Sequence, residues 1–226
     1  MTAPLRIAVL ASGRGSNLQA ILDAIASGDL AAEVVGVFSD RRDAVALERA
    51  TNAGIAAIAV HPRRFPDRPA FDAALFAQID ASAPDLIVCA GYMRLLGAAQ
   101  VTARAGRIIN IHPSLLPAHK GLHTHEQALD DGVDEHGASV HFVTAELDGG
   151  PVIAQAVVAV DPGDDAESLG LRVLQREHPL LLATLQLFAT RRVSLRDSAV
   201  HVDGCTLSVP MRLDSDNHLH PAHGTP

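Results

Sequence analysis

The feature that most constrains this fold is a regular alternation of short apolar runs with amphipathic segments. Buried parallel strands are short and apolar. Such runs predict five strands in the first 111 residues: Leu5–Leu10, Val34–Phe38, Ile55–Val60, Leu86–Ala90 and Arg107–Ile111. The first run ends in small residues and Gly, as expected where a strand leads into a tight turn.

Helices are predicted between these strands. In the segment Leu18–Ser27, apolar residues recur with helical spacing, and Gly28 follows as a C-terminal stop. Further helices are predicted over Ala44–Ala53, before Gly54, and around Ala70–Ala81. The alternation predicts an α/β fold with a doubly wound, mostly parallel sheet flanked by helices, Rossmann-like in its N-terminal half.

The pattern changes after Pro117. A short helix, two strands, a long helix and a hairpin with Asp203-Gly204 at its turn are predicted at Glu126–Asp130, Ser139–Val143, Val152–Val160, Asp165–Thr190, and Ala199–Val202 with Cys205–Leu207. No repeat or long linker is evident. We therefore expect one catalytic domain over residues 1–213 and a disordered polar tail over residues 214–226.

Composition excludes several classes of function. The 226 residues include 18 Lys and Arg against 26 Asp and Glu, a net charge of −8, which argues against a non-specific nucleic-acid binder. Aromatic residues are only 3% of the chain, so a platform that stacks several bases is not expected. Two distant cysteines, no signal-like N-terminus and no apolar run of membrane-spanning length predict a cytoplasmic protein that does not bind a membrane.

The loop Ser12-Gly-Arg-Gly-Ser-Asn17 falls between the first predicted strand and helix. Glycines in such a loop expose backbone N–H groups at a helix N-terminus, which favours an anion such as phosphate. Ser16 or Asn17 is expected to cap the helix. A dinucleotide fingerprint would need a third Gly where Leu18 stands, although Asp40 could stand in for its ribose-binding acid. A lone phosphate is the better interpretation, and a purely structural turn is the alternative.

A second group of polar residues, Asn110-Ile-His112, lies at the carboxyl end of a predicted strand. Residues two apart share one face of a strand, so both side chains would point toward the crevice where open α/β sheets bind ligands. Asn can donate to a developing oxyanion, and imidazole can exchange a proton near neutral pH. Asp148, beside Gly149-Gly150, would orient His112 if the two met; otherwise it is a turn residue.

The sequence offers little support for a metal site. Histidines are frequent between residues 119 and 141, but their spacing fits no zinc motif and most fall in a predicted polar loop: His119, His123, His125, His136 and His141. We therefore expect no metal.

Four segments together resemble the phosphoribosylglycinamide formyltransferase family: Ile7–Ile21, Ala90–Leu96, Asn110–Pro117 and His141–Pro151. The resemblance runs from about residue 5 to residue 208, in order. It implies the formyltransferase fold and transfer of a formyl group from 10-formyltetrahydrofolate, as cosubstrate, to the amino group of glycinamide ribonucleotide in de novo purine (IMP) biosynthesis. It also implies small-molecule partners and a monomer or homodimer.

The resemblance further implies roles for individual residues. Asn110, His112 and Asp148 match the catalytic trio. The ribonucleotide and its phosphate would be bound by Gly15, Ser16, Asn17, Leu174, Gln175, Arg176 and Glu177. The folate would be bound by Arg68, Met93, Arg94, Leu95, Leu96, Asn110, Thr144, Ala145, Glu146, Leu147 and Asp148.

Other functions stay open at this point. A formyltetrahydrofolate hydrolase and a methionyl-tRNA formyltransferase share the His-Pro-Ser-type loop, but each is expected to carry a further domain. A nicotinamide-dependent oxidoreductase would need the missing glycine. A nucleotide-binding protein without enzymatic activity would explain the Ser12–Asn17 loop but not Asn110 or His112.

Overall fold

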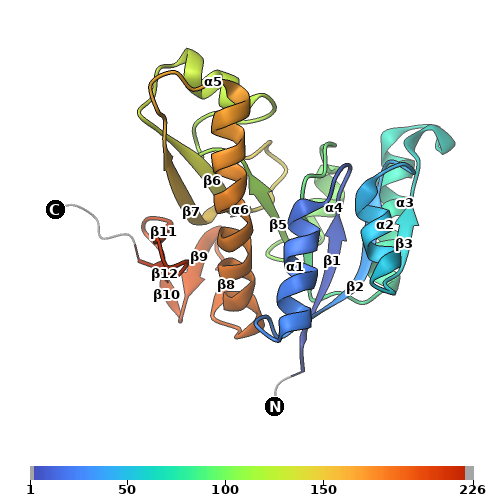
Figure 1. Ribbon diagram of the computed structural model, residues 1–226. Helices are drawn as coiled ribbons and strands as arrows, with labels where there is room; N and C mark the ends of the chain where they lie inside the picture. The colour runs from blue at the N-terminus through green and yellow to red at the C-terminus, as the bar shows by residue number, and fades with distance from the viewer. Residues whose placement is uncertain (1–2, 222–226) are drawn as a thin grey trace. The chain divides into compact units, whose positions relative to one another are not determined.

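The computed structural model describes residues 3–221 (Figure 1). Its contacts divide the chain into two compact units, one ending at Asn110 and the other beginning at Ile111. We describe each unit separately. The expectation of a single domain over residues 1–213 stays a prediction.

The first unit contains a parallel sheet with strand order β5-β4-β1-β2-β3. Its strands are β1 (Leu5–Leu10), β2 (Ala32–Ser39), β3 (Ala57–Ala59), β4 (Leu86–Cys89) and β5 (Ile108–His112), whose last two residues belong to the second unit. The centre of the sheet is fully buried, as the near-continuous apolar runs predict: Ile7, Val9 and Val88 are each 0% exposed. All five predicted strands are confirmed within a few residues.

The strand order places a topological switch point between β1 and β4. The chain leaves β1 for β2 on one side, and β4 lies on the other side of β1. In such sheets the loops at the carboxyl ends of these two strands form a binding crevice. Two hydrogen bonds join these loops: Ser12 N donates to the Gly91 carbonyl (2.9 Å), and Met93 N donates to Ser12 Oγ (2.9 Å).

The helices of the first unit are α1 (Ser16–Ser27), α2 (Val45–Asn52), α3 (Arg68–Ala81), α4 (Ala98–Thr102) and the 3-10 turn η1 (Pro62–Arg64). Right-handed crossovers place α1 and α2 on one face of the sheet and α3 on the other. The caps follow the sequence: Gly28 ends α1 in the left-handed conformation at φ 84°, and Asp67 begins α3 by accepting the Ala70 N–H (2.8 Å).

The second unit contains a mixed sheet with order β12-β11-β7-β6 and a small antiparallel sheet with order β10-β9-β8. Their strands are β6 (Glu135–Phe142), β7 (Val152–Ala159), β11 (Met211–Leu213), β12 (Leu219–His220), β8 (Val193–Arg196), β9 (Ala199–Val202) and β10 (Cys205–Thr206). The helix α6 (Ala166–Ala189) contacts β6 and β7, and the short α5 (Thr124–Asp130) contacts α6. A capping box between Asp165 and Ser168 begins α6.

The expectation of a disordered tail from Asp214 is wrong for residues 214–221. Asp214 organises a turn: its Oδ1 accepts the N–H groups of Asp216 and His218 (both 2.9 Å), and β12 then pairs with β11. Arg176 holds the same turn, donating to the Asp214 carbonyl (2.6 Å) and to Asn217 Oδ1 (3.0 Å). Residues 222–226 lie outside the described residues.

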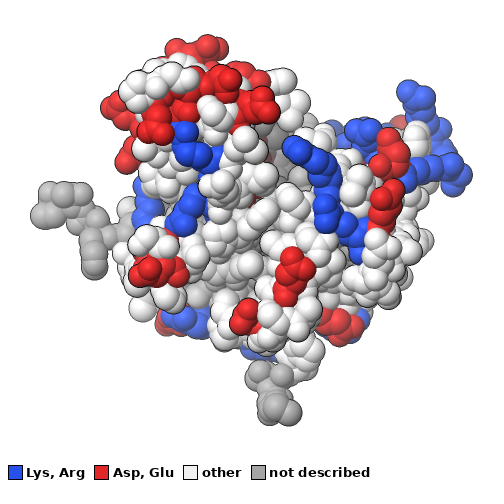
Figure 2. Space-filling view, in the orientation of Figure 1, with Lys and Arg blue, Asp and Glu red and all other residues white. Residues whose placement is uncertain are grey.

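The acidic excess belongs to the second unit. Residues 1–110 carry 11 Lys and Arg against 10 Asp and Glu, whereas residues 111–226 carry 7 against 16. Figure 2 shows acidic side chains gathered over α5 and the loops beside it. The net charge of −8 is therefore not spread evenly over the two units.

The two cysteines are free and differ in environment. Cys89, in β4, is buried, and burial raises the pKa of its thiol to about 12. Cys205, in β10, is exposed. Among residues 3–221, no helix is long and apolar enough to cross a membrane.

Candidate active site

The loop after β1 leads into α1 through Gly15. This residue is the N-cap of α1, at φ 68°, and a Cβ built on it would lie 2.7 Å from the Ala46 Cβ. The expected cap by Ser16 or Asn17 is wrong, because the helix already begins at Ser16 and no side chain caps it. The first-turn N–H groups of a helix lack acceptors within the helix. An anion is the partner that such groups and the helix dipole favour.

Asp40, directly after β2, is already engaged by Ser12. It is only 8% exposed, and its Oδ1 accepts a hydrogen bond from Ser12 Oγ (2.6 Å). Ser12 Oγ in turn accepts the Met93 N–H. The pair therefore fixes the start of the 93–96 segment at the switch point.

The residues expected to bind folate in the first unit form one exposed surface. Met93 and Leu95 are 64% and 54% exposed, which is unusual for large apolar side chains and is typical of a binding surface. Arg68 Nη2 donates to the Leu95 carbonyl (2.7 Å). Arg94 is exposed, and Leu96 is half-buried. The structure thus brings Arg68 together with the 93–96 segment.

Asn110 and His112 lie two residues apart near the end of β5, as the sequence predicted. Asn110 is half-buried, and His112 is 5% exposed. Both ring nitrogens of His112 face oxygen atoms: Nδ1 is 3.6 Å from Asp148 Oδ2, and Nε2 is 3.0 Å from the His119 carbonyl. The ring of His112 is therefore held between a carboxylate and a backbone carbonyl.

Asp148 lies between two imidazole rings. Its Oδ2 faces His112 and accepts the Gly121 N–H (2.9 Å), while its Oδ1 is 3.7 Å from His141 Nε2. The backbone of Asp148 has φ 45°, the left-handed region that non-glycine residues rarely adopt. Such strain commonly marks a functional position.

From the sequence, His141 is considered only as a metal ligand and as part of a family motif, not as a neighbour of Asp148. It lies in β6, 2% exposed, and its Nδ1 is 3.0 Å from the Phe142 carbonyl. Burial lowers the pKa of His141 to about 4, although the Asp148 carboxylate acts in the opposite direction. Near neutral pH the ring is therefore uncharged. The predicted strand places His141 and Phe142 on opposite faces of the sheet, but it does not predict that His141 meets Asp148.

The segment 144–148 is an exposed loop fastened at two points to the turn at residues 120–121. Lys120 Nζ donates to Glu146 Oε1 (2.8 Å), and the Gly121 N–H donates to Asp148. Ala145 and Leu147 are exposed, and Thr144 is half-buried. The first contact fixes the loop two residues before Asp148, and the second fixes Asp148 itself.

The residues 174–177 form one turn of α6 and cannot all face one ligand. Consecutive helical residues point about 100° apart. Gln175 is exposed, Leu174 is half-buried and Arg176 holds the turn at residues 214–217. Glu177 is half-buried.

The histidine-rich segment is more buried than expected. His136 lies in β6 rather than in a polar loop, and His125 Nδ1 is 3.1 Å from its Nε2. His141 lies in β6 as the predicted strand Ser139–Val143 implies. Burial, with the neighbouring histidines, lowers the pKa of His136 to about 4. Among the described residues, no group of three or more His, Cys, Asp or Glu side chains is arranged to hold a metal ion.

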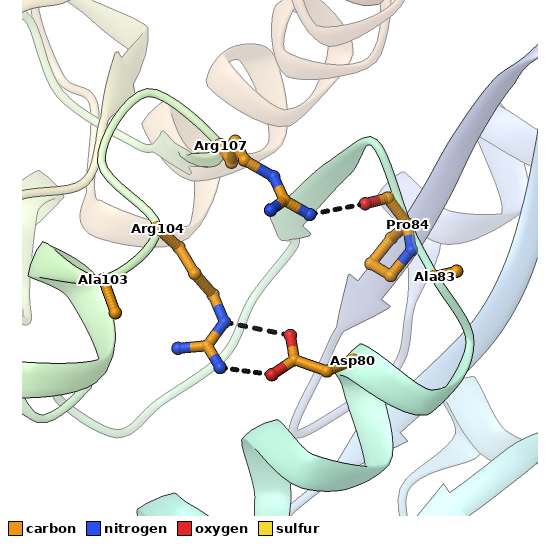
Figure 3. Close-up of a pocket in the computed structure, with 6 residues that line it drawn as sticks. All are labelled: Asp80, Ala83, Pro84, Ala103, Arg104 and Arg107. Atoms are coloured by element: carbon orange, nitrogen blue, oxygen red, sulfur yellow. Dashed lines mark hydrogen bonds and ion pairs between the residues drawn. The ribbon is translucent and has the colours of Figure 1, made fainter.

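A cavity of about 320 Å³ lies in the first unit, away from these residues (Figure 3). Figure 3 shows Arg104 paired with Asp80 through two contacts, while Arg107 Nη2 donates to the Pro84 carbonyl (2.7 Å). The cavity opens near the amino ends of β4 and β5, opposite to the switch-point crevice. Since its charged groups already bind one another, we assign it no role.

Known proteins identify the family of this chain. The profile of the formyl transferase family matches residues 5–185. The chain is 50% identical over 200 residues to the phosphoribosylglycinamide formyltransferase of Escherichia coli (strain K12), covering 88% of this chain and 94% of that relative. The chain belongs to the formyl transferase family. The resemblance inferred from the sequence motifs is thus confirmed, and the chain is an enzyme of the transferase class.

Solved structures of formyl transferases agree with this assignment. The phosphoribosylglycinamide formyltransferase of Coxiella burnetii superposes with a TM-score of 0.88 at 48% identity, covering 91% of this chain and 96% of that one. This confirms the predicted fold class. A formyltetrahydrofolate deformylase from Pseudomonas syringae superposes with a TM-score of 0.78 at 29% identity, covering 88% of this chain but 66% of that one.

Proposed function

We propose that this formyl transferase moves the formyl group of 10-formyltetrahydrofolate to the amino group of glycinamide ribonucleotide, a step of de novo purine (IMP) biosynthesis. The observation that carries the proposal is the close approach of His112 to Asp148. Asn110 lies two residues before His112, near the end of the same strand. The names of the relatives reported above support the two substrates. The partners are then small molecules, in the cytoplasm, with no nucleic acid or membrane involved, and the enzyme is a monomer or homodimer.

The reaction needs charge stabilisation at one oxygen. The substrate amine attacks the formyl carbon, a new N–C bond forms, and the carbonyl oxygen becomes a tetrahedral oxyanion. The side-chain amide of Asn110 and the His112 imidazolium are the donors for that oxyanion. The carboxylate of Asp148 keeps His112 charged and aligned.

One contact of His112 has to change during the reaction if Nε2 is the atom that donates. In the structure the Nε2 N–H already faces the His119 carbonyl. An oxyanion at Nε2 would compete with the His119 carbonyl for the same hydrogen. Either the turn at residues 118–121 would shift away, or the two oxygens would share that hydrogen bond. His119 has φ 50°, in the left-handed region that non-glycine residues rarely adopt.

Collapse of the intermediate breaks the bond between the formyl carbon and folate N10. The amine loses one proton, and N10 gains one. Asp148 or an ordered water carries this proton, and the other residues bind and orient the substrates. Gly15, Ser16 and Asn17 bind the ribonucleotide phosphate, with the turn of α6 at Leu174–Glu177. Arg68, Met93–Leu96 and Thr144–Asp148 bind the folate.

Hydrolysis of the formyl donor is the second candidate, because a deformylase shares the fold. The Ser12–Asn17 loop favours the ribonucleotide, since water needs no phosphate site. A spectrophotometric assay of folate product, with and without glycinamide ribonucleotide, separates the two. We expect product only with the ribonucleotide. Product formed equally fast without it would establish the hydrolase, and no product in either assay would favour a nucleotide-binding protein without this activity.

A further inference from the structure

The helix α2 lies beside α1 and contacts the loop that leads into α1 (Figure 1). At the start of α2, Ala46 N donates to the Gly13 carbonyl (3.1 Å). Ala46 is 0% exposed and packs against Gly15, where an added Cβ would lie 2.7 Å from the Ala46 Cβ. The loop at residues 13–15 is therefore shaped by α2 as well as by the helix that it precedes.

About one turn further along α2, Arg49 reaches the same loop. Its Nε donates to the Arg14 carbonyl (2.9 Å), and its Nη1 donates to Gln19 Oε1 in α1 (2.8 Å). Gln19 is held in turn, because its Nε2 donates to Asp23 Oδ1 (2.8 Å). Arg49 is half-buried and forms no ion pair with a carboxylate among residues 3–221. An uncompensated positive charge therefore lies at the Arg14 carbonyl.

This contact bears on the next residue, because the Arg14 carbonyl and the Gly15 N–H are the two ends of one planar peptide group. A cation that donates to the oxygen of a peptide draws electron density from it and makes the N–H at the other end a stronger donor. The same bond fixes the plane of the peptide and hence the direction of that N–H. The proposed function places the ribonucleotide phosphate at the N–H groups of Gly15, Ser16 and Asn17.

We propose that Arg49 is a positioning residue for phosphate binding: its guanidinium orients and polarises the Arg14–Gly15 peptide without touching the substrate. The inference rests on the proposed function, which places the phosphate at this turn. Direct contact is not required, since Nε and Nη1 of Arg49 already donate to protein acceptors. A contact that only joined α2 to α1 would contribute to stability, whereas a positioning residue also changes the affinity for phosphate.

The test replaces Arg49 by Gln, which removes the charge and keeps a polar side chain on α2. Its matched control is Arg107→Gln, at an arginine of the same unit that also donates to a backbone carbonyl, that of Pro84 (2.7 Å), directly before β5. We expect the ribonucleotide KM to rise roughly three- to tenfold in Arg49→Gln alone, the effect of one lost hydrogen bond. Since only binding is lost, kcat and the KM of the formyl donor should stay within about twofold of wild type.

Two further measurements separate phosphate binding from stability. Glycinamide riboside, the acceptor without its phosphate, should react equally in the wild type and in Arg49→Gln. Inorganic phosphate is the probe that needs no turnover. In amide NMR spectra of the wild type it should shift the signals of Gly15, Ser16 and Asn17, and its Kd should rise in Arg49→Gln by a factor similar to that of the ribonucleotide KM.

A ribonucleotide KM in Arg49→Gln equal to that of the control would overturn the proposal and leave the proposed function standing. An equal loss with ribonucleotide and riboside would also overturn it, because the phosphate would then not be concerned. If the wild type transfers no formyl group, the proposed function fails, and the phosphate titration decides the role of Arg49. Equal phosphate Kd values in variant and control, or shifts only outside residues 15–17, would overturn that role.

A second variant keeps the test decisive if Arg49→Gln does not fold. Gln19→Met leaves the charge of Arg49 in place but removes the acceptor that holds its guanidinium against α1. We expect this variant to raise the ribonucleotide KM and the phosphate Kd in the same direction as Arg49→Gln, by a smaller factor. Values equal to those of the wild type would overturn the proposal.

Discussion

The carboxylate of Asp148 has three polar neighbours. It faces His112 and His141 and accepts the Gly121 N–H. Burial keeps His141 uncharged near neutral pH.

Loss of either member of this pair is expected to abolish most of the activity. His112→Ala removes an oxyanion donor, and Asp148→Asn keeps an acceptor for Gly121 but removes the charge that stabilises the imidazolium. We expect kcat to fall by roughly 10²- to 10³-fold in each variant, with the unfolding midpoint little changed. Steady-state kinetics check this. His123→Ala, at a histidine whose side chain is 76% exposed, is the control. Activity near that of the control in either variant would contradict the assignment.

The buried histidines of β6 make stability depend on pH. His136 and His141 have folded-state pKa values of about 4 because burial disfavours their charged forms, whereas an unfolded histidine titrates near 6.5. Below pH 6.5 the unfolded chain therefore binds protons that the folded chain does not. The stabilisation is fully present above pH 6.5 and is lost as the pH falls toward 4, by about 1.4 kcal/mol per pH unit for each group.

The free energy of unfolding in urea, measured between about pH 7 and pH 5, tests this dependence. His136→Gln should flatten the slope by the contribution of one group. The exposed His123→Gln should leave the slope as it is in the wild type. An unchanged slope in the His136 variant would mean that this ring is protonated in the folded protein.

At the scale of elements, the junction of β1 with α1 depends on one glycine. Gly15 needs both its left-handed backbone and the absence of a Cβ, which would overlap Ala46. Gly28, at the other end of α1, has a similar backbone, but no atom lies within 4 Å of the position that a Cβ would take there. A substitution at Gly28 therefore introduces backbone strain alone, whereas one at Gly15 introduces both backbone strain and steric overlap.

Gly28→Ala is expected to cost roughly 1–2 kcal/mol of stability through backbone strain alone and to leave the ribonucleotide KM unaltered. Gly15→Ala should cost more, because Ala46 must move, and should raise the ribonucleotide KM as the first turn of α1 shifts. Urea unfolding and initial-rate kinetics on both variants check this. A ribonucleotide KM equal in the two variants would argue against phosphate binding at this turn.

At the scale of the whole chain, no general basic field attracts the anionic ribonucleotide. The first unit has nearly equal numbers of acidic and basic residues, and the second is strongly acidic. If local N–H groups at the Gly15–Asn17 turn bind the phosphate, as proposed, those close contacts are screened little by salt. We expect kcat/KM for the ribonucleotide to change less than about threefold between about 0.05 M and 0.5 M salt. A tenfold or steeper fall would reveal long-range attraction.

The sequence predicted the parts of the fold that depend on local pattern. Apolar runs located the strands of the first sheet, and Gly28 and Gly54 follow the helices they were expected to end. The short elements α4 and β8, of five and four residues, were missed. Order in residues 214–221 was missed, although the turn at Asp214 is local, because the polar composition was interpreted as a tail; Arg176, 38 residues earlier, adds a contact.

The candidate site shows the same division. Asn110 and His112 could be found because a strand end places both on one face. The approach of Asp148 to His112 was only a hypothesis, and His141 was overlooked, because both contacts join residues far apart in the chain. The expected helix cap at Ser16 or Asn17 failed for a local reason: Gly15 already turns the chain one residue earlier.

The contrast between the two cysteines provides a chemical handle. A thiol must ionise and be reached by reagent before it can be alkylated, and Cys89 in β4 meets neither condition. Cys205 in β10 meets the second. A maleimide dye should therefore attach once per folded chain, at Cys205, without any engineered substitution. Every natural molecule thus carries a single attachment point for a fluorophore or spin label.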